Sequence, residues 1–173
     1  MGGSGEATPE RTYARRTGRV VVLDADDRVL LLRVLRQPHH PAAGVVWYTP
    51  GGGLQAGENA RQAAARELRE ETGLSCVAED LRPVATTSGH AEAHWISGLV
   101  RDDYFLLRVD RPPIDTSGQT AAEKDSHDGF RWWHLDDLVR SPDPVHPPSL
   151  PGLMGRLVAR QVPDHVVELP WVW

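Results

Sequence analysis

The sequence has 173 residues, of which 40% are hydrophobic and 25% charged, and this length and balance predict one globular domain with a sizeable core. Its net charge is −5 and its 19 basic residues are scattered, so the chain offers no basic stripe for duplex nucleic acid. No apolar run approaches the roughly 18 residues that a membrane span needs, and a single cysteine excludes an intramolecular disulfide. We therefore expect a cytoplasmic protein without a membrane or duplex nucleic acid as partner.

The N-terminal part of the chain predicts a tail followed by strands. Residues 1–12 are small and polar and predict a flexible tail, which leaves 13–173 as a single domain. Two nearly continuous apolar runs, 17–23 and 29–36, flank an acidic turn and predict a hairpin whose strands are buried on both faces. A further short strand at 45–48 leads into a glycine-rich segment.

That segment reads Thr-Pro-Gly-Gly-Gly over residues 49–53. Proline fixes its own φ, and three successive glycines allow either a positive φ or a close approach of the backbone to a ligand. The glycines are equally compatible with a tight turn between a strand and a helix. They do not by themselves decide between a ligand site and a turn.

A helix follows, and both of its ends are marked in the sequence. Asn59 is placed as the N-cap with Gln62 three residues later, which is the spacing of a capping box. Gly73 takes the position just after the last turn. The helix is expected to lie close on a sheet through a narrow apolar stripe formed by Ala60, Ala64 and Leu68.

Three glutamates crowd one face of this helix. Glu67, Glu70 and Glu71 stand at i, i+3 and i+4, so their carboxylates repel one another. The helix dipole disfavours acids in the last turn, and Arg66 offsets only part of the repulsion by reaching Glu70. A hard divalent cation such as Mg²⁺ would relieve it, whereas a solvated acidic face is the alternative.

At this point the residues resemble a known family. Gly52, five residues, Glu58, seven residues and the run from Arg66 to Leu74 (RELREETGL) match the signature box of the Nudix hydrolases at every specified position. Average residue usage would produce such a match on the order of once in 10⁹ starting positions. The resemblance implies an α/β (α+β) fold: a mixed β-sheet sandwiched between helices, with the loop and helix of residues 52–74 at the cleft.

The resemblance also implies a reaction and its residues. Such enzymes use Mg²⁺ or Mn²⁺ and water to hydrolyse the pyrophosphate bond of a nucleoside diphosphate that is linked to another moiety. Arg66 is expected to orient the carboxylates by an ion pair, and Glu58 to support it. The implied metal ligands, of which Glu70 and Glu71 are also expected to be catalytic, are Glu67, Glu70, Glu71 and the carbonyl of Gly52.

Two other functions stay open from the sequence. A Nudix-like domain that has lost catalysis would bind a nucleotide and regulate a partner, but it would have no need to retain all three glutamates. A plain acidic-helix interaction protein would show no dependence on metal. The substrate is also open among nucleoside triphosphates, sugar nucleotides, dinucleoside polyphosphates and capped RNA ends. The candidates for binding its non-reacting part are Trp47, Tyr48, Trp95, Arg101 and Tyr104.

The strands after the box are less sharply marked. Residues 81–88 predict a strand in which Pro83 indicates an edge or a bulge, and 89–98 predict a loop. Residues 99–110 predict a strand from Asp103 onwards. Its core face is expected to carry Phe105, Leu107 and Val109.

A polar segment, 114–128, precedes a strand at 130–134 with Trp132 and Trp133 on opposite faces. This ending is similar to that of many bacterial members of the family, in which a glutamate before the paired tryptophans lies near the metals. Glu123 is the candidate for that position, as an extra metal ligand or as the general base. Asp125 and Asp128 are held in reserve.

The C-terminal part predicts two short helices, at 135–139 and at 153–162, separated by an irregular proline-rich segment. The tail 163–173 contains Trp171 and Trp173. Such a tail would be a sticky patch if exposed, so it is expected to dock either on its own domain or across a homodimer.

Overall fold

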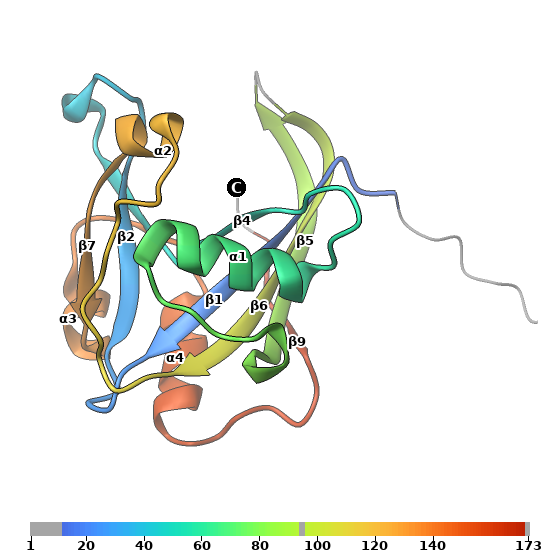
Figure 1. Cartoon of the computed structure of the whole chain (residues 1–173), viewed down its shortest axis with the longest axis vertical. Coiled ribbons are helices and arrows are strands. Elements are labelled where there is room, and N and C mark those ends of the chain that lie inside the picture. Colours follow the sequence, from blue (N-terminus) through green and yellow to red (C-terminus); the bar gives the residue numbers. More distant parts are fainter. Residues whose placement is uncertain (1–11, 94–95, 172–173) are drawn as a thin grey trace, which may run out of the picture.

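In the computed structural model, which describes residues 12–93 and 96–171, a curled mixed sheet runs through the molecule with helices on both sides (Figure 1). Within these residues the strands are β1 (Arg15–Leu23), β2 (Val29–Leu35), β3 (Val45–Tyr48), β4 (Gly51–Gly53), β5 (Arg82–Ala93), β6 (Ile96–Arg108), β7 (His127–Trp133), β8 (Val145–His146) and β9 (Val167–Glu168). The helices are α1 (Ala60–Thr72), α2 (Ala121–Ser126), α3 (Leu135–Arg140) and α4 (Leu150–Val158), with short 3₁₀ turns at Pro41–Ala43 and Ala78–Asp80.

The sheet order is β8-β3-β2-β1-β6-β5-β9, with β4 paired to β1 and β7 paired to β2. β1 pairs antiparallel with β2 at its C-terminal end, at Leu23, and antiparallel with β4 over Thr17–Arg19. The two parts of this strand therefore have different partners, and the sheet divides along it. β1 runs parallel to β6 over its full length. The expected mixed sheet between helices is confirmed.

Both faces of the sheet are covered, which explains the continuous apolar character of β1. Val20 and Val22 belong to a core cluster with α1, whereas Val21 and Leu23 belong to a second cluster with α3 and α4. All four are fully buried, as the sequence predicted.

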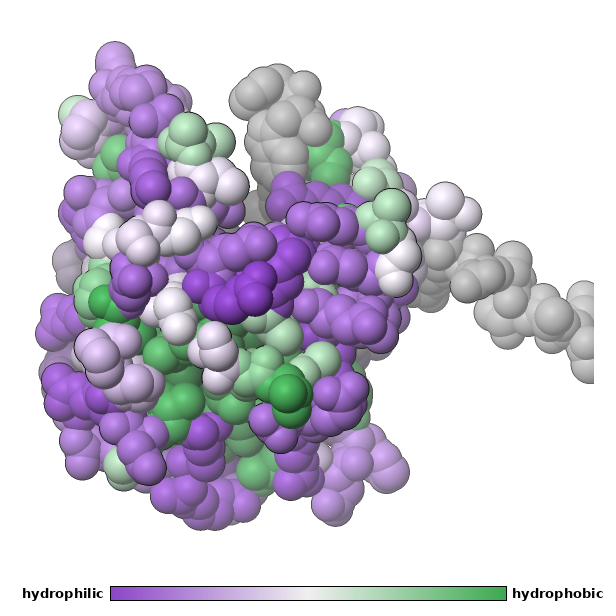
Figure 2. All heavy atoms as spheres, viewed as in Figure 1, coloured by the Kyte–Doolittle hydropathy of each residue, from purple (hydrophilic) through white to green (hydrophobic). Residues whose placement is uncertain are grey.

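Helix α1 lies very close to the sheet. A Cβ on Gly18 of β1 would stand 1.9 Å from the carbonyl oxygen of Ala60, so only glycine permits this approach. The predicted stripe of Ala60, Ala64 and Leu68 is buried against it. In Figure 2 hydrophilic residues dominate the exposed side of α1, and hydrophobic ones appear beneath it.

The predicted ends of α1 are confirmed. The side chain of Asn59 accepts from the backbone N–H of Gln62, and the side chain of Gln62 accepts in return from the N–H of Asn59. Gly73 has φ 72° and its N–H donates to the carbonyl of Arg69. These local signals therefore fix where α1 begins and ends, and with the buried stripe they determine which way its acidic face points.

Two predictions about the strands after α1 are wrong or incomplete. The predicted loop at 89–98 is mostly strand, because β5 extends to Ala93 and pairs with β6, for example Gly89 with Val100. The stretch has a single β-branched residue, Ile96, and is held by this pairing, which a local pattern does not reveal. The predicted core face of β6 is only one of two, since Tyr104 and Leu106 are buried on the opposite face. The bulge predicted at Pro83 is confirmed by a register shift between Pro83 and Ala85.

The C-terminal predictions also need adjustment. The polar segment 114–128 contains α2, the proline-rich segment contains β8, and α4 begins at Leu150 rather than at residue 153. As far as Trp171, the tail docks on its own domain, with β9 parallel to β5 and Leu169 buried. Most of the predicted N-terminal tail and Trp173 lie outside the described residues. No helix in the described part of the chain has the length and apolarity to cross a membrane.

A candidate metal centre and the adjoining cleft

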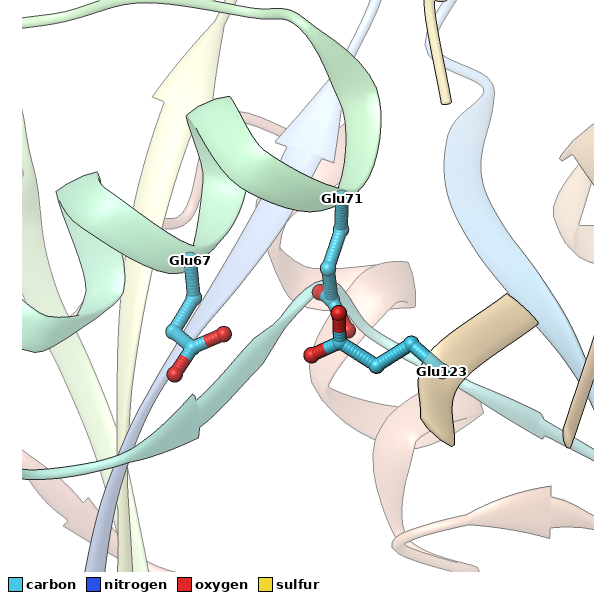
Figure 3. Close-up of side chains that lie close together, drawn as sticks. All are labelled: Glu67, Glu71 and Glu123. Atoms are coloured by element: carbon cyan, nitrogen blue, oxygen red, sulfur yellow. The ribbon is translucent and has the colours of Figure 1, made fainter. Parts of the chain in front are cut away.

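Three carboxylates from two helices converge beside β4. Glu67 and Glu71 project from α1, and Glu123 projects toward them from α2 on the other side (Figure 3). Each of the three offers an oxygen, and these oxygens all lie within 4.8 Å of one another. Residues 52 positions apart in sequence therefore form one acidic cluster.

Glu71 is the most buried member, with 6% of its side chain exposed. Its Oε2 accepts a 2.7 Å hydrogen bond from the backbone N–H of Gly51. Burial is the main cause that raises the pKa of Glu71 to about 8; the charges of Glu67 and Glu123 act in the same direction, and the Gly51 N–H and Arg19 oppose the rise. An additional cation at this point would restore the charged form.

Glu67 lies directly against the glycine turn. A Cβ on Gly52 would stand 2.5 Å from both Cδ and Oε1 of Glu67, so the absence of a side chain at residue 52 makes room for this carboxylate. Burial raises the pKa of Glu67, and hydrogen bonding to Arg66 opposes the rise. The role of the Gly52 carbonyl as a ligand stays a prediction.

Arg66 connects the acids that surround it. Its Nε and one terminal nitrogen donate to the two oxygens of Glu58 at 2.8 and 3.0 Å, and its other terminal nitrogen donates to Glu67 at 2.7 Å and to Glu70 at 3.2 Å. It also donates to a backbone carbonyl of β4. Hydrogen bonding to Arg66 lowers the pKa of Glu58. The roles of Arg66 in orienting the carboxylates and of Glu58 in supporting it stay predictions.

Glu70 is placed differently from the other two glutamates of the box. Its carboxylate lies beside Arg66, and it is not one of the three acids that converge in the described part of the chain. Its roles as metal ligand and catalytic residue therefore stay predictions.

Glu123 is held by the first turn of α2. Its Oε2 accepts a 2.7 Å hydrogen bond from the N–H of Thr120, while the Thr120 hydroxyl accepts from the N–H of Glu123. The two reserve candidates point elsewhere: Asp125 is exposed, and Asp128 is exposed and paired with Arg33. Of Glu123, Asp125 and Asp128, it is therefore Glu123 that reaches the cluster.

His127 lies next to the cluster and was not identified from the sequence. Its Nε2 is 3.9 Å from Glu71 Oε1, and its Nδ1 is 3.0 Å from the side-chain nitrogen of Gln119. Burial lowers the pKa of His127. A neutral imidazole at this position adds no positive charge to the cluster at pH 7.

A cleft of about 340 Å³ opens from the carboxylates and contains two guanidinium groups. Its lining includes Arg15 and Arg19 of β1, together with Tyr48 of β3. Arg19 donates to the carbonyl of Thr49 at 3.1 Å and remains next to open space. Neither arginine was identified from the sequence. The available signal was that both stand at alternating positions of the strand, before its apolar run.

A smaller pocket of about 100 Å³ adjoins this cleft and shares Arg15, Arg19 and Tyr48 with it. Asp102 of β6 and His146 of β8 also line this pocket. Asp102 accepts a 2.5 Å hydrogen bond from the Thr17 hydroxyl, and its carboxylate is 3.7 Å from Nε2 of His146. A ligand could therefore extend from the acidic cluster into this second pocket.

The five residues predicted to bind the rest of the substrate are placed unequally. Tyr48 lines both pockets. Trp47 and Tyr104 are buried in the core, where Trp47 packs edge to face on Trp133 at 5.0 Å. Arg101 pairs with Asp103 at 2.8 Å and is not among the residues that line either pocket. Trp95 lies outside the described residues.

The residues of the acidic cluster suit a hard divalent cation. Mg²⁺ and Mn²⁺ prefer carboxylate oxygens, and three of these converge where burial already disfavours their charges. Such an ion would be held by Glu67, Glu71 and Glu123. Arg66 holds the carboxylate of Glu67 by a hydrogen bond.

Fold and site together define an α+β protein with an acidic cluster beside a cationic cleft, and comparison identifies its family. The family model described as NUDIX domain matches residues 12–153. The chain is 31% identical over 137 residues to the uncharacterized Nudix hydrolase YvcI of Bacillus subtilis (strain 168), covering 76% of this chain and 73% of that protein. The chain belongs to the Nudix family.

Two further similarities are informative. The RNA pyrophosphohydrolase of Sodalis glossinidius is 35% identical over 124 residues, which cover 65% of this chain and 65% of that protein. The crystal structure of a C. elegans Ap4A hydrolase binary complex superposes with a TM-score of 0.60 at 23% identity, covering 84% of this chain and 98% of that one. The second similarity concerns the fold alone.

Proposed function

We propose that this chain is a metal-dependent pyrophosphohydrolase that cleaves the pyrophosphate bond of a nucleoside diphosphate linked to another moiety. The observation that carries the proposal is the convergence of Glu67, Glu71 and Glu123 within 4.8 Å at one end of a cleft containing Arg15 and Arg19. A diphosphate is a polyanion that needs cations on several of its oxygens, and this cleft combines a cation site with guanidinium groups. The names of the relatives, which include an RNA pyrophosphohydrolase, support a nucleotide as the substrate class.

In this reaction a water oxygen bonds to one phosphorus, the bridging P–O bond breaks, and two phosphate-bearing products leave. Bound Mg²⁺ or Mn²⁺ would neutralise phosphate charge and lower the pKa of water. Glu123 has one oxygen that is not bonded to the N–H of Thr120, and this oxygen would serve either as an extra metal ligand or as the general base that accepts the proton from the attacking water. Arg66 keeps Glu67 oriented toward the cluster. Arg15 and Arg19 lie where they can bind the phosphates along the cleft.

The test is a panel assay of the purified chain with Mg²⁺ or Mn²⁺, using nucleoside triphosphates, sugar nucleotides, dinucleoside polyphosphates and capped RNA, with products separated by chromatography. We expect cleavage that a chelator abolishes and that Glu67→Gln, Glu71→Gln or Glu123→Gln reduces by a factor of about 10² or more. Glu79→Gln is the matched control, because Glu79 is an exposed carboxylate outside the cluster.

Two results would contradict the proposal. Turnover that persists in a chelator, or that the three cluster variants leave unchanged, would remove the metal-dependent mechanism. Nucleotide binding without turnover of any compound in the panel would favour a silent nucleotide-binding domain instead.

A further inference from the structure

The second pocket is built on three neighbouring strands whose side chains form rows across the sheet. Val100 of β6 stands opposite Gly89 of β5 and Arg15 of β1. In the next row Asp102 stands opposite Thr87 and Thr17. These rows lie on the face of the sheet opposite α1, because Tyr104, two residues further along β6, belongs to the cluster with α3 and α4. The pocket therefore lies over three paired strands of the sheet.

The C-terminal segment is fastened along the outer edge of these rows. β9 runs parallel to β5, and the N–H of Leu169 donates to the carbonyl of Thr86 at 2.7 Å. The hydroxyl of Thr87 donates to the carbonyl of Leu169 at 3.2 Å, and the Leu169 side chain is buried. These contacts fix the position of Trp171 two residues later.

Trp171 occupies a space that one glycine leaves. A Cβ on Gly89 would stand 2.1 Å from both Cγ and Cδ1 of the indole, so the ring lies directly over the backbone of residue 89. Its Nε1 donates to the carbonyl of His90 at 3.2 Å. Trp171 is half-buried and lines the second pocket together with Ala91, Ile96 and Val100. The indole thus forms an apolar wall of the pocket, in the space that the absence of a side chain at Gly89 leaves.

The same pocket also contains a buried carboxylate, that of Asp102. Although burial opposes its charge, the pKa of Asp102 falls to about 2 because His146, Arg19 and Thr17 stabilise the carboxylate. The rings of Tyr48 and His146 lie beside it with centroids 5.0 Å apart. Apolar and aromatic walls with an ionised acceptor suit a planar ring that carries N–H donors, which is the chemistry of a nucleobase.

We infer that Trp171 is a specificity-determining residue that contacts the base of the nucleotide, with Gly89 as the residue that positions its ring. The inference rests on the proposed function for where the diphosphate lies. Arg15, Arg19 and Tyr48 line both pockets, so one ligand can place its diphosphate at the carboxylates and its base against Trp171. The C-terminal segment thereby supplies a wall of the binding site as well as a strand of the sheet.

The test compares Trp171→Ala, Trp171→Phe and Gly89→Ala with the control Val166→Ala, which changes an exposed residue of the same segment. Stacking on an aromatic side chain is worth enough that its loss should raise KM about 5- to 100-fold for the best nucleotide substrate of the panel. We expect kcat to stay within about twofold, since the carboxylates are untouched, and Trp171→Phe to recover part of the affinity. Gly89→Ala should resemble Trp171→Ala because its methyl group displaces the indole.

A binding measurement separates this inference from the proposed function. Nucleoside monophosphates carry the base but no pyrophosphate bond, and their binding is measured by calorimetry without metal. Weaker binding to Trp171→Ala and Gly89→Ala, with Val166→Ala unchanged, supports the inference even if the chain hydrolyses nothing. Equal binding or equal KM for wild type and Trp171→Ala, or no nucleotide binding by wild type, overturns it even if hydrolysis occurs. Melting temperatures of all variants confirm that they are folded.

Discussion

Gly52→Ala is the substitution with the most sharply defined geometric effect on the acidic cluster. The added Cβ would stand 2.5 Å from Cδ and Oε1 of Glu67, whereas ordinary van der Waals contact begins at 3.4 Å. The carboxylate or strand β4 must therefore move by about 0.9 Å, the difference between these distances. Since a displacement of about 1 Å in a catalytic arrangement can cost a factor of about 10², we expect kcat to fall by about that factor.

The adjacent residue provides a matched control. Gly53→Ala adds the same methyl group to the same strand, but its Cβ meets nothing closer than Arg15 Nε at 3.8 Å. The control should keep turnover near that of wild type. Overpacking by Gly52→Ala should lower the free energy of unfolding by about 1–3 kcal/mol, so both variants stay folded at 25 °C.

The assay is turnover of the best substrate over a Mg²⁺ titration, with melting temperatures measured in parallel. The expected signature is a lower kcat and weaker apparent metal binding for Gly52→Ala alone. If the two variants retain equal kcat and equal metal dependence, the close approach of residue 52 to Glu67 has no functional consequence, and the reasoning fails.

Two further predictions concern stability. Arg66→Met leaves partly buried carboxylates without their cation, so we expect the free energy of unfolding to fall by about 2–3 kcal/mol and activity to fall by about 10- to 100-fold. The control is Arg69→Met, which changes an exposed residue and should alter neither urea denaturation nor turnover appreciably. For Asp102 the folded-state pKa of about 2 lies below its usual value, so its stabilisation is present above pH 4, roughly, and is lost as pH falls toward 2. The difference in unfolding free energy between wild type and Asp102→Asn should shrink by about 2 kcal/mol over that range in urea titrations, and a constant difference would contradict the prediction.

The elements that could be predicted from sequence are those whose causes are local. The capping box of Asn59 and Gln62, the left-handed Gly73 and the stripe of α1 depend on residues within one helix, and all are confirmed. The continuous apolar run of β1 likewise predicted burial on both faces. Such signals also brought Glu67 and Glu71 to one helix face without any knowledge of the sheet.

The remaining features depend on contacts between distant residues. The stretch 89–98 has the composition of a loop and becomes strand only because β6 pairs with it. Trp47 and Tyr104 have the side chains of ligand-binding residues, but the register of their strands buries them in the core. Arg19 is the reverse case. A cation next to an apolar run suggests only the end of a strand, yet Arg19 lies in the cleft because the sheet divides at β1.

These two kinds of cause correspond to the two ends of the proposed site. The part of the acidic end that carries Glu67 and Glu71 depends on one turn and one helix, so a short sequence pattern identifies it, whereas Glu123 comes from α2, a helix that was not predicted from the sequence. The opposite end depends on the register of β5, β6 and β1 and on a C-terminal segment that reaches Gly89 from 82 residues away in sequence (Trp171 minus Gly89). A chain organised in this way can change what it binds by altering the second end, because the hydrogen bonds that hold Glu67 and Glu71 come from Arg66 of α1 and from Gly51 of the glycine turn. The substrate should therefore be sought through Trp171 and Asp102 rather than through the glutamates.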